Sequence, residues 1–125
     1  MRLLLDTHAL LWALADPERL SDAARRAISE GHNEVLASAA SAWEIAIKRE
    51  AGKLRAPDDI VEAAEQTGFE WLAISARHAI LAGSLPANHR DPFDRMLVAQ
   101  ADRVGAIVVS RDVAFLSYGT DVLSA

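Results

Sequence analysis

The sequence predicts an α/β domain in which a parallel sheet is covered by helices on both faces. Short apolar runs alternate along the chain with segments of helical periodicity, and that alternation implies right-handed crossovers between parallel strands. The 125 residues are enough for one domain with a substantial core, and a hydrophobic content of 51% favours a globular fold over disorder. We therefore treat residues 1–125 as a single domain.

The elements follow from apolar runs, helix caps and glycine stops. Strands are expected at residues 2–5, 34–37, 71–74, 106–109 and 121–123. Helices are expected at residues 7–15, 22–29, from Ser38 or Ser41 to near Gly52, 60–66, 76–82, 92–104 and 113–116. The expected N-terminal caps are Ser21 with Asp22, Ser38 or Ser41, Asp58, Ser75 and Asp91 with Pro92. The expected stops are Gly31, Gly68 and Gly105. Because Trp12 lies in an apolar run, we expect its ring in the core, where truncation affects stability rather than chemistry.

The composition excludes several kinds of chemistry. The chain has no cysteine, so disulfides, thiolate nucleophiles and cysteine zinc sites are ruled out, in keeping with a reducing cytoplasm. No apolar run approaches the length of a membrane span or a signal peptide, so no membrane partner is expected. No glycine-rich nucleotide motif and no nucleophile elbow occurs, so we expect neither a nucleotide cofactor nor a covalent hydrolase.

Four acidic residues occupy the ends or starts of predicted elements: Asp6, Glu44, Asp94 and Asp112. Asp6 and Asp112 follow predicted strands, whereas Glu44 and Asp94 are expected in the first turns of two helices. Ligands of open parallel sheets bind beyond the carboxyl ends of the strands, and carboxylates gathered there repel one another unless a cation lies between them. The pattern predicts a site for Mg²⁺ or Mn²⁺.

Each acid also has a simpler interpretation. Asp6, Asp91 and Asp112 could be helix caps, and Glu44 could be a solvated partner of Lys48 at i,i+4. We favour Asp94 as a ligand and Asp91 as a cap or outer acid.

Thr7 and Ser110 are expected to support the neighbouring acids by hydrogen bonds. His8 is expected on the surface or in packing rather than in chemistry.

The net charge of −5 argues against nucleic acid as a partner, but four of the negative charges belong to the predicted metal site. Basic residues also cluster in sequence at Lys48, Arg49, Lys53, Arg55, His89, Arg90 and Arg95. The polar loop at 84–90 precedes Asp91 and could reach over a substrate.

Four segments carry a resemblance to a known family: residues 4–12, 41–48 with 52–54, 89–101 and 110–112. They contain Leu-Leu-Asp-Thr-His, Ser-Ala-Trp-Glu-Ile, Asp-Pro-Phe-Asp-Arg and Ser-Arg-Asp, in this order along nearly the whole chain. With them the chain resembles the PIN-domain ribonucleases, and more closely the VapC-type toxins of toxin–antitoxin pairs.

The resemblance implies a three-layer α/β/α fold with a parallel sheet of about five strands. It also implies an acidic quartet of Asp6, Glu44, Asp94 and Asp112 that binds Mg²⁺ or Mn²⁺ and cuts RNA endonucleolytically by means of a metal-activated water. Glu44 would complete the site or position the water. The implied partners are a small antitoxin that blocks the site and a second copy of the chain in a homodimer. Candidates to hold RNA phosphates are Lys48, Lys53, Arg90, Arg95 and Arg111.

Three alternative interpretations of the function remain beside the ribonuclease interpretation. A receiver-like switch needs an adjacent acid pair after the first strand, where Asp6 stands alone, and a dehalogenase-like phosphatase needs an aspartate where His8 stands. A catalytically inactive PIN scaffold that binds RNA or a protein is the third, and the complete acidic set argues against it.

Overall fold

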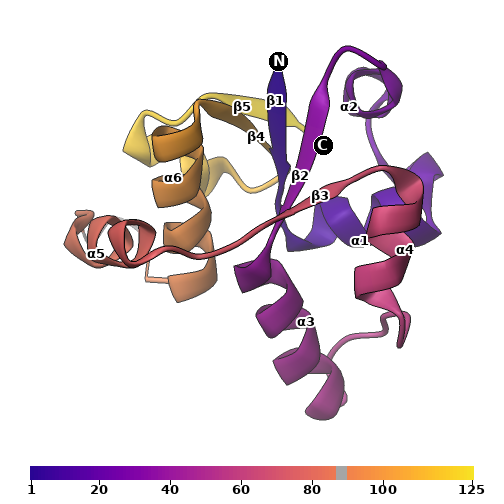
Figure 1. Ribbon diagram of the computed structural model, residues 1–125, viewed down its shortest axis with the longest axis horizontal. Coiled ribbons are helices and arrows are strands. Elements are labelled where there is room, and N and C mark those ends of the chain that lie inside the picture. The colour runs from indigo at the N-terminus through magenta and orange to yellow at the C-terminus, as the bar shows by residue number, and fades with distance from the viewer. Residues whose placement is uncertain (87–89) are drawn as a thin grey trace.

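A computed structural model of the chain, describing residues 1–86 and 90–125, contains a five-stranded sheet with every strand parallel to its neighbours. The strand order is β3-β2-β1-β4-β5 (Figure 1). The strands are β1 (Arg2–Leu5), β2 (Glu34–Ser38), β3 (Glu70–Leu72), β4 (Ala106–Ser110) and β5 (Val122–Ser124). The helices are α1 (Thr7–Ala15), η1 (Pro17–Arg19), α2 (Asp22–Ser29), α3 (Ala39–Glu50), α4 (Ile60–Thr67), α5 (Ala76–Ser84), α6 (Pro92–Val104) and η2 (Val113–Tyr118), where η denotes a 3₁₀-helix.

The sheet separates two hydrophobic cores, which makes the fold the predicted three-layer α/β/α architecture. Side chains alternate between the two faces of a strand, so in β1 Leu3 and Leu5 enter one core while Leu4 enters the other. The first core lies under α1, α2 and α4, and the second lies under α6 and η2, with α5 packed outside α6 (Figure 1).

The chain order places a crevice at the centre of the sheet. From β1 the chain adds β2 and β3 on one side, then returns to add β4 and β5 on the other side of β1. The strand order therefore reverses between β1 and β4, and in open α/β sheets this is where ligands bind. Asp6 directly follows β1, and Arg111 and Asp112 directly follow β4. The helix α3 runs outward from the same edge of the sheet (Figure 1).

Most predicted boundaries are confirmed to within two residues, and the exceptions have local causes. Ser38 rather than Ser41 caps α3, with its Oγ accepting from Ala40 N at 3.0 Å. The predicted cap Asp58 is wrong: Asp59 precedes α4 and makes no side-chain cap bond. The exposed carboxylate of Asp58 instead lies 3.7 Å from the Arg49 guanidinium.

Two further expectations are corrected by the positions of the elements. Glu44 is not in the first turn of its helix, because α3 begins at Ala39 and places it in the second turn. The third strand is shorter than expected and ends at Leu72, because β2 offers partners only to Glu70–Leu72. Of the loop at 84–90, Ser84 belongs to α5 and residues 87–89, including His89, lie outside the described part of the chain.

Within the described residues, no helix combines the length and the apolar composition needed to cross a bilayer.

Candidate functional site

All four acids of the predicted quartet line one open cleft of about 490 Å³ beyond the carboxyl ends of β1 and β4. The cleft residues come from α1, η1, α3, the start of α6 and the segments that follow β1 and β4. They are Asp6, Thr7, His8, Trp12, Arg19, Glu44, Lys48, Asp91, Asp94, Arg111 and Asp112. Segments far apart in sequence thus bring five carboxylates to one place.

Asp6 is both a helix cap and a cleft residue. Its Oδ1 accepts from Ala9 N at 2.8 Å as the N-cap of α1, and its Oδ2 accepts from Ser110 Oγ at 2.5 Å. The residue is 8% exposed. Burial raises the pKa of Asp6, although the bonds from Ser110 and Ala9 act in the opposite direction, and the nearby charge of Glu44 adds to the increase. A cation at Asp6 would relieve the cost of this buried charge.

Glu44 is held from two sides. It is 5% exposed, and Thr7 Oγ1 donates to its Oε1 at 2.5 Å while Lys48 Nζ donates to its Oε2 at 2.5 Å. The Thr7 hydroxyl also lies 3.2 Å from Ser41 Oγ. The alternative interpretation of Glu44 as a solvated partner of Lys48 is therefore confirmed for the ion pair and wrong for the solvation, because the carboxylate is buried.

Lys48 is the cation of the cleft that is paired with one of its acids. The bond to Glu44 is the main cause that raises the pKa of Lys48, and the charges of Asp91 and Asp94 contribute in the same direction. The ammonium group thus lies in the field of three carboxylates.

The remaining acids lie at the starts of two helices, where Asp91 and Asp112 are N-caps. Asp91 is the N-cap of α6, and its Oδ1 accepts from Phe93 N at 2.9 Å and from Asp94 N at 3.3 Å. Asp94 follows in the first turn of α6. Asp112 caps η2 through Ala114 N at 2.9 Å, and its own N–H donates to Ser110 Oγ at 2.9 Å. Asp91 and Asp112 therefore cap helices and also line the cleft, because both helices begin at this edge of the sheet.

The predicted phosphate-binding residues divide into two groups. Lys48 and Arg111 line the cleft, whereas Lys53, Arg90 and Arg95 are not among its lining residues. The Arg95 guanidinium donates to backbone carbonyls at the end of α5 and just after it: Ala82 at 2.9 Å, Gly83 at 3.4 Å, Leu85 at 2.8 Å and Pro86 at 3.0 Å. This places Arg95 as an anchor between α5 and α6.

Three cleft residues were not predicted for the site: His8, Trp12 and Arg19. The expectation that Trp12 is a core residue is only partly right, because its ring packs against the first core but is partly buried and lines the cleft. His8 is four residues earlier on α1, and the two ring centroids are 5.9 Å apart. That i,i+4 spacing directly after Asp6 is the signal that could have found both, whereas no sequence signal marks Arg19.

The cleft supplies the oxygen donors that Mg²⁺ and Mn²⁺ prefer, but it is not closed around an ion. Among residues 1–86 and 90–125, no three His, Asp or Glu side chains are arranged to hold a metal ion. The donor set nevertheless fits a hard cation, since it consists of carboxylates and includes the buried Asp6 with its raised pKa.

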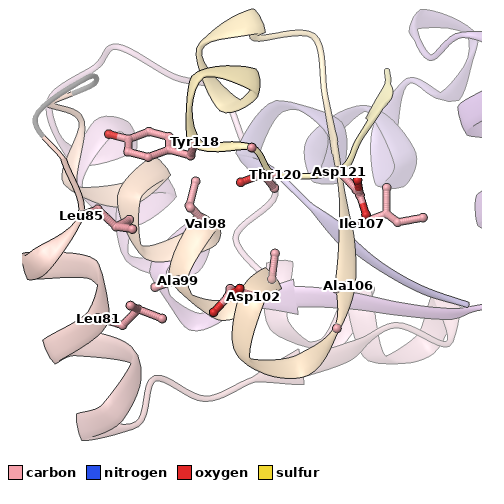
Figure 2. A pocket seen from close by; sticks show the side chains of 13 residues that line it. Leu81, Leu85, Val98, Ala99, Asp102, Ala106, Ile107, Tyr118, Thr120 and Asp121 are labelled. Carbon is pink, nitrogen blue, oxygen red and sulfur yellow. The ribbon is translucent and has the colours of Figure 1, made fainter.

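A second hollow of about 450 Å³ lies between α5, α6 and η2, and contains none of the predicted site residues (Figure 2). Its lining mixes apolar side chains such as Leu81, Leu85 and Val98 with Asp102 and Asp121. These carboxylates are therefore outside the acidic cleft and offer matched controls for substitutions within it.

Comparisons with known proteins agree with the fold and identify the family. The family model described as PIN domain matches residues 3–120. The chain is 34% identical over 113 residues to Ribonuclease VapC22 of Mycobacterium tuberculosis (strain ATCC 25618 / H37Rv), covering 87% of this chain and 85% of that protein.

Solved structures with the same fold include chains of two VapBC assemblies. A chain of VapBC2 from Rickettsia felis, bound to a promoter DNA fragment, superposes with a TM-score of 0.73 at 14% identity and covers 98% of both chains. A chain of DNA-bound VapBC from Salmonella typhimurium has a TM-score of 0.69 at 19% identity, with 98% of this chain and 97% of that one covered. At these identities the two structures support the fold alone. The family model and the relative at 34% identity show that the chain belongs to the PIN domain family, as a VapC-type member.

Proposed function

We propose that the protein is a metal-dependent endoribonuclease that acts as the toxin of a toxin–antitoxin pair. One observation carries the proposal: four carboxylates from separate segments meet in a single cleft at the point where the strand order reverses. The 34% identity to a protein named Ribonuclease VapC22 supports RNA as the substrate.

The four acids would have different roles in binding the ion and the attacking water. Asp6, Asp94 and Asp112 would hold Mg²⁺ or Mn²⁺ directly or through water. When bound, the ion supplies Lewis-acid activation of a water and neutralises charge at the leaving oxygen. Ser110 keeps Asp6 in place through its 2.5 Å bond, and Thr7 does the same for Glu44. Glu44 would complete the ion's site or orient the attacking water.

The cleft's cations would hold the RNA backbone. Lys48 and Arg111 line the same cleft as the acids, so a phosphate bound to the ion would lie within their reach. Lys53, Arg90 and Arg95 remain proposed phosphate contacts, although they are not among the residues that line the cleft.

We propose a small antitoxin as the protein partner and a homodimer as the oligomeric state. The structures with TM-scores of 0.73 and 0.69 are VapBC assemblies, which supports an antitoxin of that type. An antitoxin that covers the cleft would neutralise its carboxylates with a basic side chain.

The first test is cleavage of total cellular RNA by purified, antitoxin-free protein with Mg²⁺, with Mn²⁺ and with EDTA. We expect discrete fragments that require the metal and disappear in Asp94→Asn. The matched control is Asp102→Asn, which removes a carboxylate from the same helix but from the second hollow, and which we expect to cut normally. RNA that is bound but left intact with both metals by folded protein would favour the inactive scaffold instead.

A further inference from the structure

The ring of Trp12 lies under two guanidinium groups at the acidic cleft. The guanidinium carbon of Arg111 is 4.3 Å from the ring centroid, and that of Arg19 is 5.2 Å from it. Both distances are within the range of cation–π contacts. All three residues line the cleft, and Arg111 is the sequence neighbour of Asp112.

Arg111 is fixed in place by more than the ring. Its Nε donates to the backbone oxygen of Ala125 at 3.1 Å, and its Nη2 donates to the backbone oxygen of Arg19. A guanidinium carries five N–H donors, so three remain after these two bonds. Within residues 1–86 and 90–125, no acceptor is paired with those three donors.

The carboxylates of the cleft do not neutralise this group. Among the described residues, no ion pair joins Arg111 to an acid, and the ion pair of Arg19 is with Asp16, 3.9 Å away and outside the cleft lining. The cleft therefore contains carboxylates together with an anchored guanidinium that forms no ion pair among the described residues. A ligand that uses both the carboxylates, through a cation, and the guanidinium carries several anionic groups along a chain, as a phosphodiester backbone does.

We propose that Trp12 is a positioning residue that holds Arg111, with Arg19 beside it, to bind an RNA phosphate next to the one that is cut. The inference rests on the proposed function, because it presumes RNA in the cleft. The aromatic face restricts the guanidinium, and the bonds to Ala125 and Arg19 leave its remaining donors available in a fixed geometry. Trp12 thereby contributes to substrate binding without touching the reacting atoms.

The simpler role for Trp12 is packing alone, since the ring also contacts the first core. Packing and positioning differ in one measurable property, the salt dependence of RNA binding. Each lost phosphate contact lowers the slope of log K against log salt by about 0.7 for a single strand. A loss of packing that leaves the protein folded does not change that slope.

The test measures binding of a fluorescein-labelled, unstructured single-stranded RNA by fluorescence anisotropy at several salt concentrations. The parent carries Asp94→Asn, so that the RNA stays intact. We expect Arg111→Gln to weaken binding about tenfold and to lower the slope by about 0.7. Trp12→Leu should change affinity and slope in the same direction, and adding Trp12→Leu to Arg111→Gln should weaken binding no further than about twofold.

Matched controls separate this effect from general changes in charge or stability. Trp71→Leu removes another partly buried tryptophan, whose Nε1 donates to Val61 O at 3.2 Å away from the cleft. Arg2→Gln removes one positive charge at the opposite, amino end of β1, where the guanidinium pairs with Glu34 at 2.8 Å. Both should keep the parent's slope. Trp12→Phe preserves an aromatic face and the packing, so it serves if Trp12→Leu does not fold, with a smaller loss of affinity expected.

The outcomes separate the inference from the function on which it rests. A parent that does not bind RNA overturns the proposed function and the inference with it. A parent that binds, with affinity and slope unchanged in both Trp12 variants, overturns the inference alone. Additive losses in the double variant also overturn it, because they would show that Trp12 acts independently of Arg111.

Discussion

Ser110 Oγ donates a 2.5 Å hydrogen bond to Oδ2 of Asp6 across a sequence separation of 104 residues. The bond ties the residue that ends β4 to the residue that follows β1, at the place where the strand order reverses. The same Ser110 Oγ accepts from Asp112 N at 2.9 Å. One buried hydroxyl therefore bonds to the carboxylate of one predicted acid and to the backbone of another, and so links the segments that carry them.

The buried charge of Asp6 gives the first prediction, a pH-dependent cost to stability. Burial raises the pKa of Asp6 above its ordinary value of 3.8, so the folded state binds its proton more tightly than the unfolded state. The stability that this proton contributes is present at pH values below the unfolded pKa. It is lost as pH rises through the folded pKa, at about 1.4 kcal/mol for each unit between the two values.

Asp6→Asn removes this titration and isolates its effect. In EDTA, the free energy of unfolding of Asp6→Asn relative to the natural chain should increase as pH rises from about 3.8 and then level off above the folded pKa. Urea denaturation at a series of pH values measures the difference. A difference that stays constant with pH would contradict the raised pKa.

The pair formed by Lys48 and Glu44 gives the second prediction. The Glu44 side chain is 7% exposed and the Lys48 side chain 39%, and their 2.5 Å contact leaves Glu44 dependent on Lys48 for neutralisation. Lys48→Met should destabilise the metal-free protein by about 1–3 kcal/mol, because a charge in a buried position loses its charged hydrogen-bond partner. Adding Glu44→Gln should restore most of this loss, as judged by urea denaturation in EDTA. If Lys48→Met is as stable as the natural chain, solvation by water is enough to stabilise the Glu44 carboxylate without Lys48.

The third prediction is that alanine substitutions at two glycines change the stability of the protein in opposite directions. Gly105 ends α6 with φ at +69°, whereas Gly83 lies within α5 at a negative φ, and a Cβ would meet nothing within 4 Å at either position. Gly105→Ala should destabilise the protein by about 1–2 kcal/mol, the cost of a side chain in the left-handed region. Gly83→Ala should stabilise it by up to about 1 kcal/mol through helix propensity. The melting temperatures of the two variants should therefore move in opposite directions, and a shift in the same direction would contradict the backbone argument.

The fold could be predicted from the sequence because its signals are local. Three-residue and four-residue apolar runs, serine or aspartate caps and glycine stops lie within a few residues of each boundary, and most boundaries agree. The errors arise where two local signals compete: Asp58 and Asp59 are both possible caps, and Trp71–Ile74 continues the composition of a strand after the partner strand has ended.

The site could be predicted only in part, because its geometry depends on the sheet order. The acids were recognisable from their positions after strands and at helix starts, but the link from Ser110 to Asp6 requires β4 to lie beside β1. Arg19 belongs to the cleft because η1 lies next to α1, and its backbone oxygen accepts from Arg111. A contact between residues so far apart in sequence leaves no periodic pattern to read.

Metal binding gives the last prediction, and it can be tested without RNA. If the cleft holds a divalent ion, titration of Mn²⁺ into the natural chain should give one saturable site by isothermal calorimetry or by water-proton relaxation. Asp94→Asn should weaken the affinity at least about tenfold, by loss of a ligand or of the group that orients one. Asp102→Asn should bind as the natural chain does, because this carboxylate lies in the second hollow although it belongs to the same helix (Figure 2). Equal weakening by both substitutions would mean that Mn²⁺ senses the overall negative charge, and the acidic cleft would then have no specific ion site.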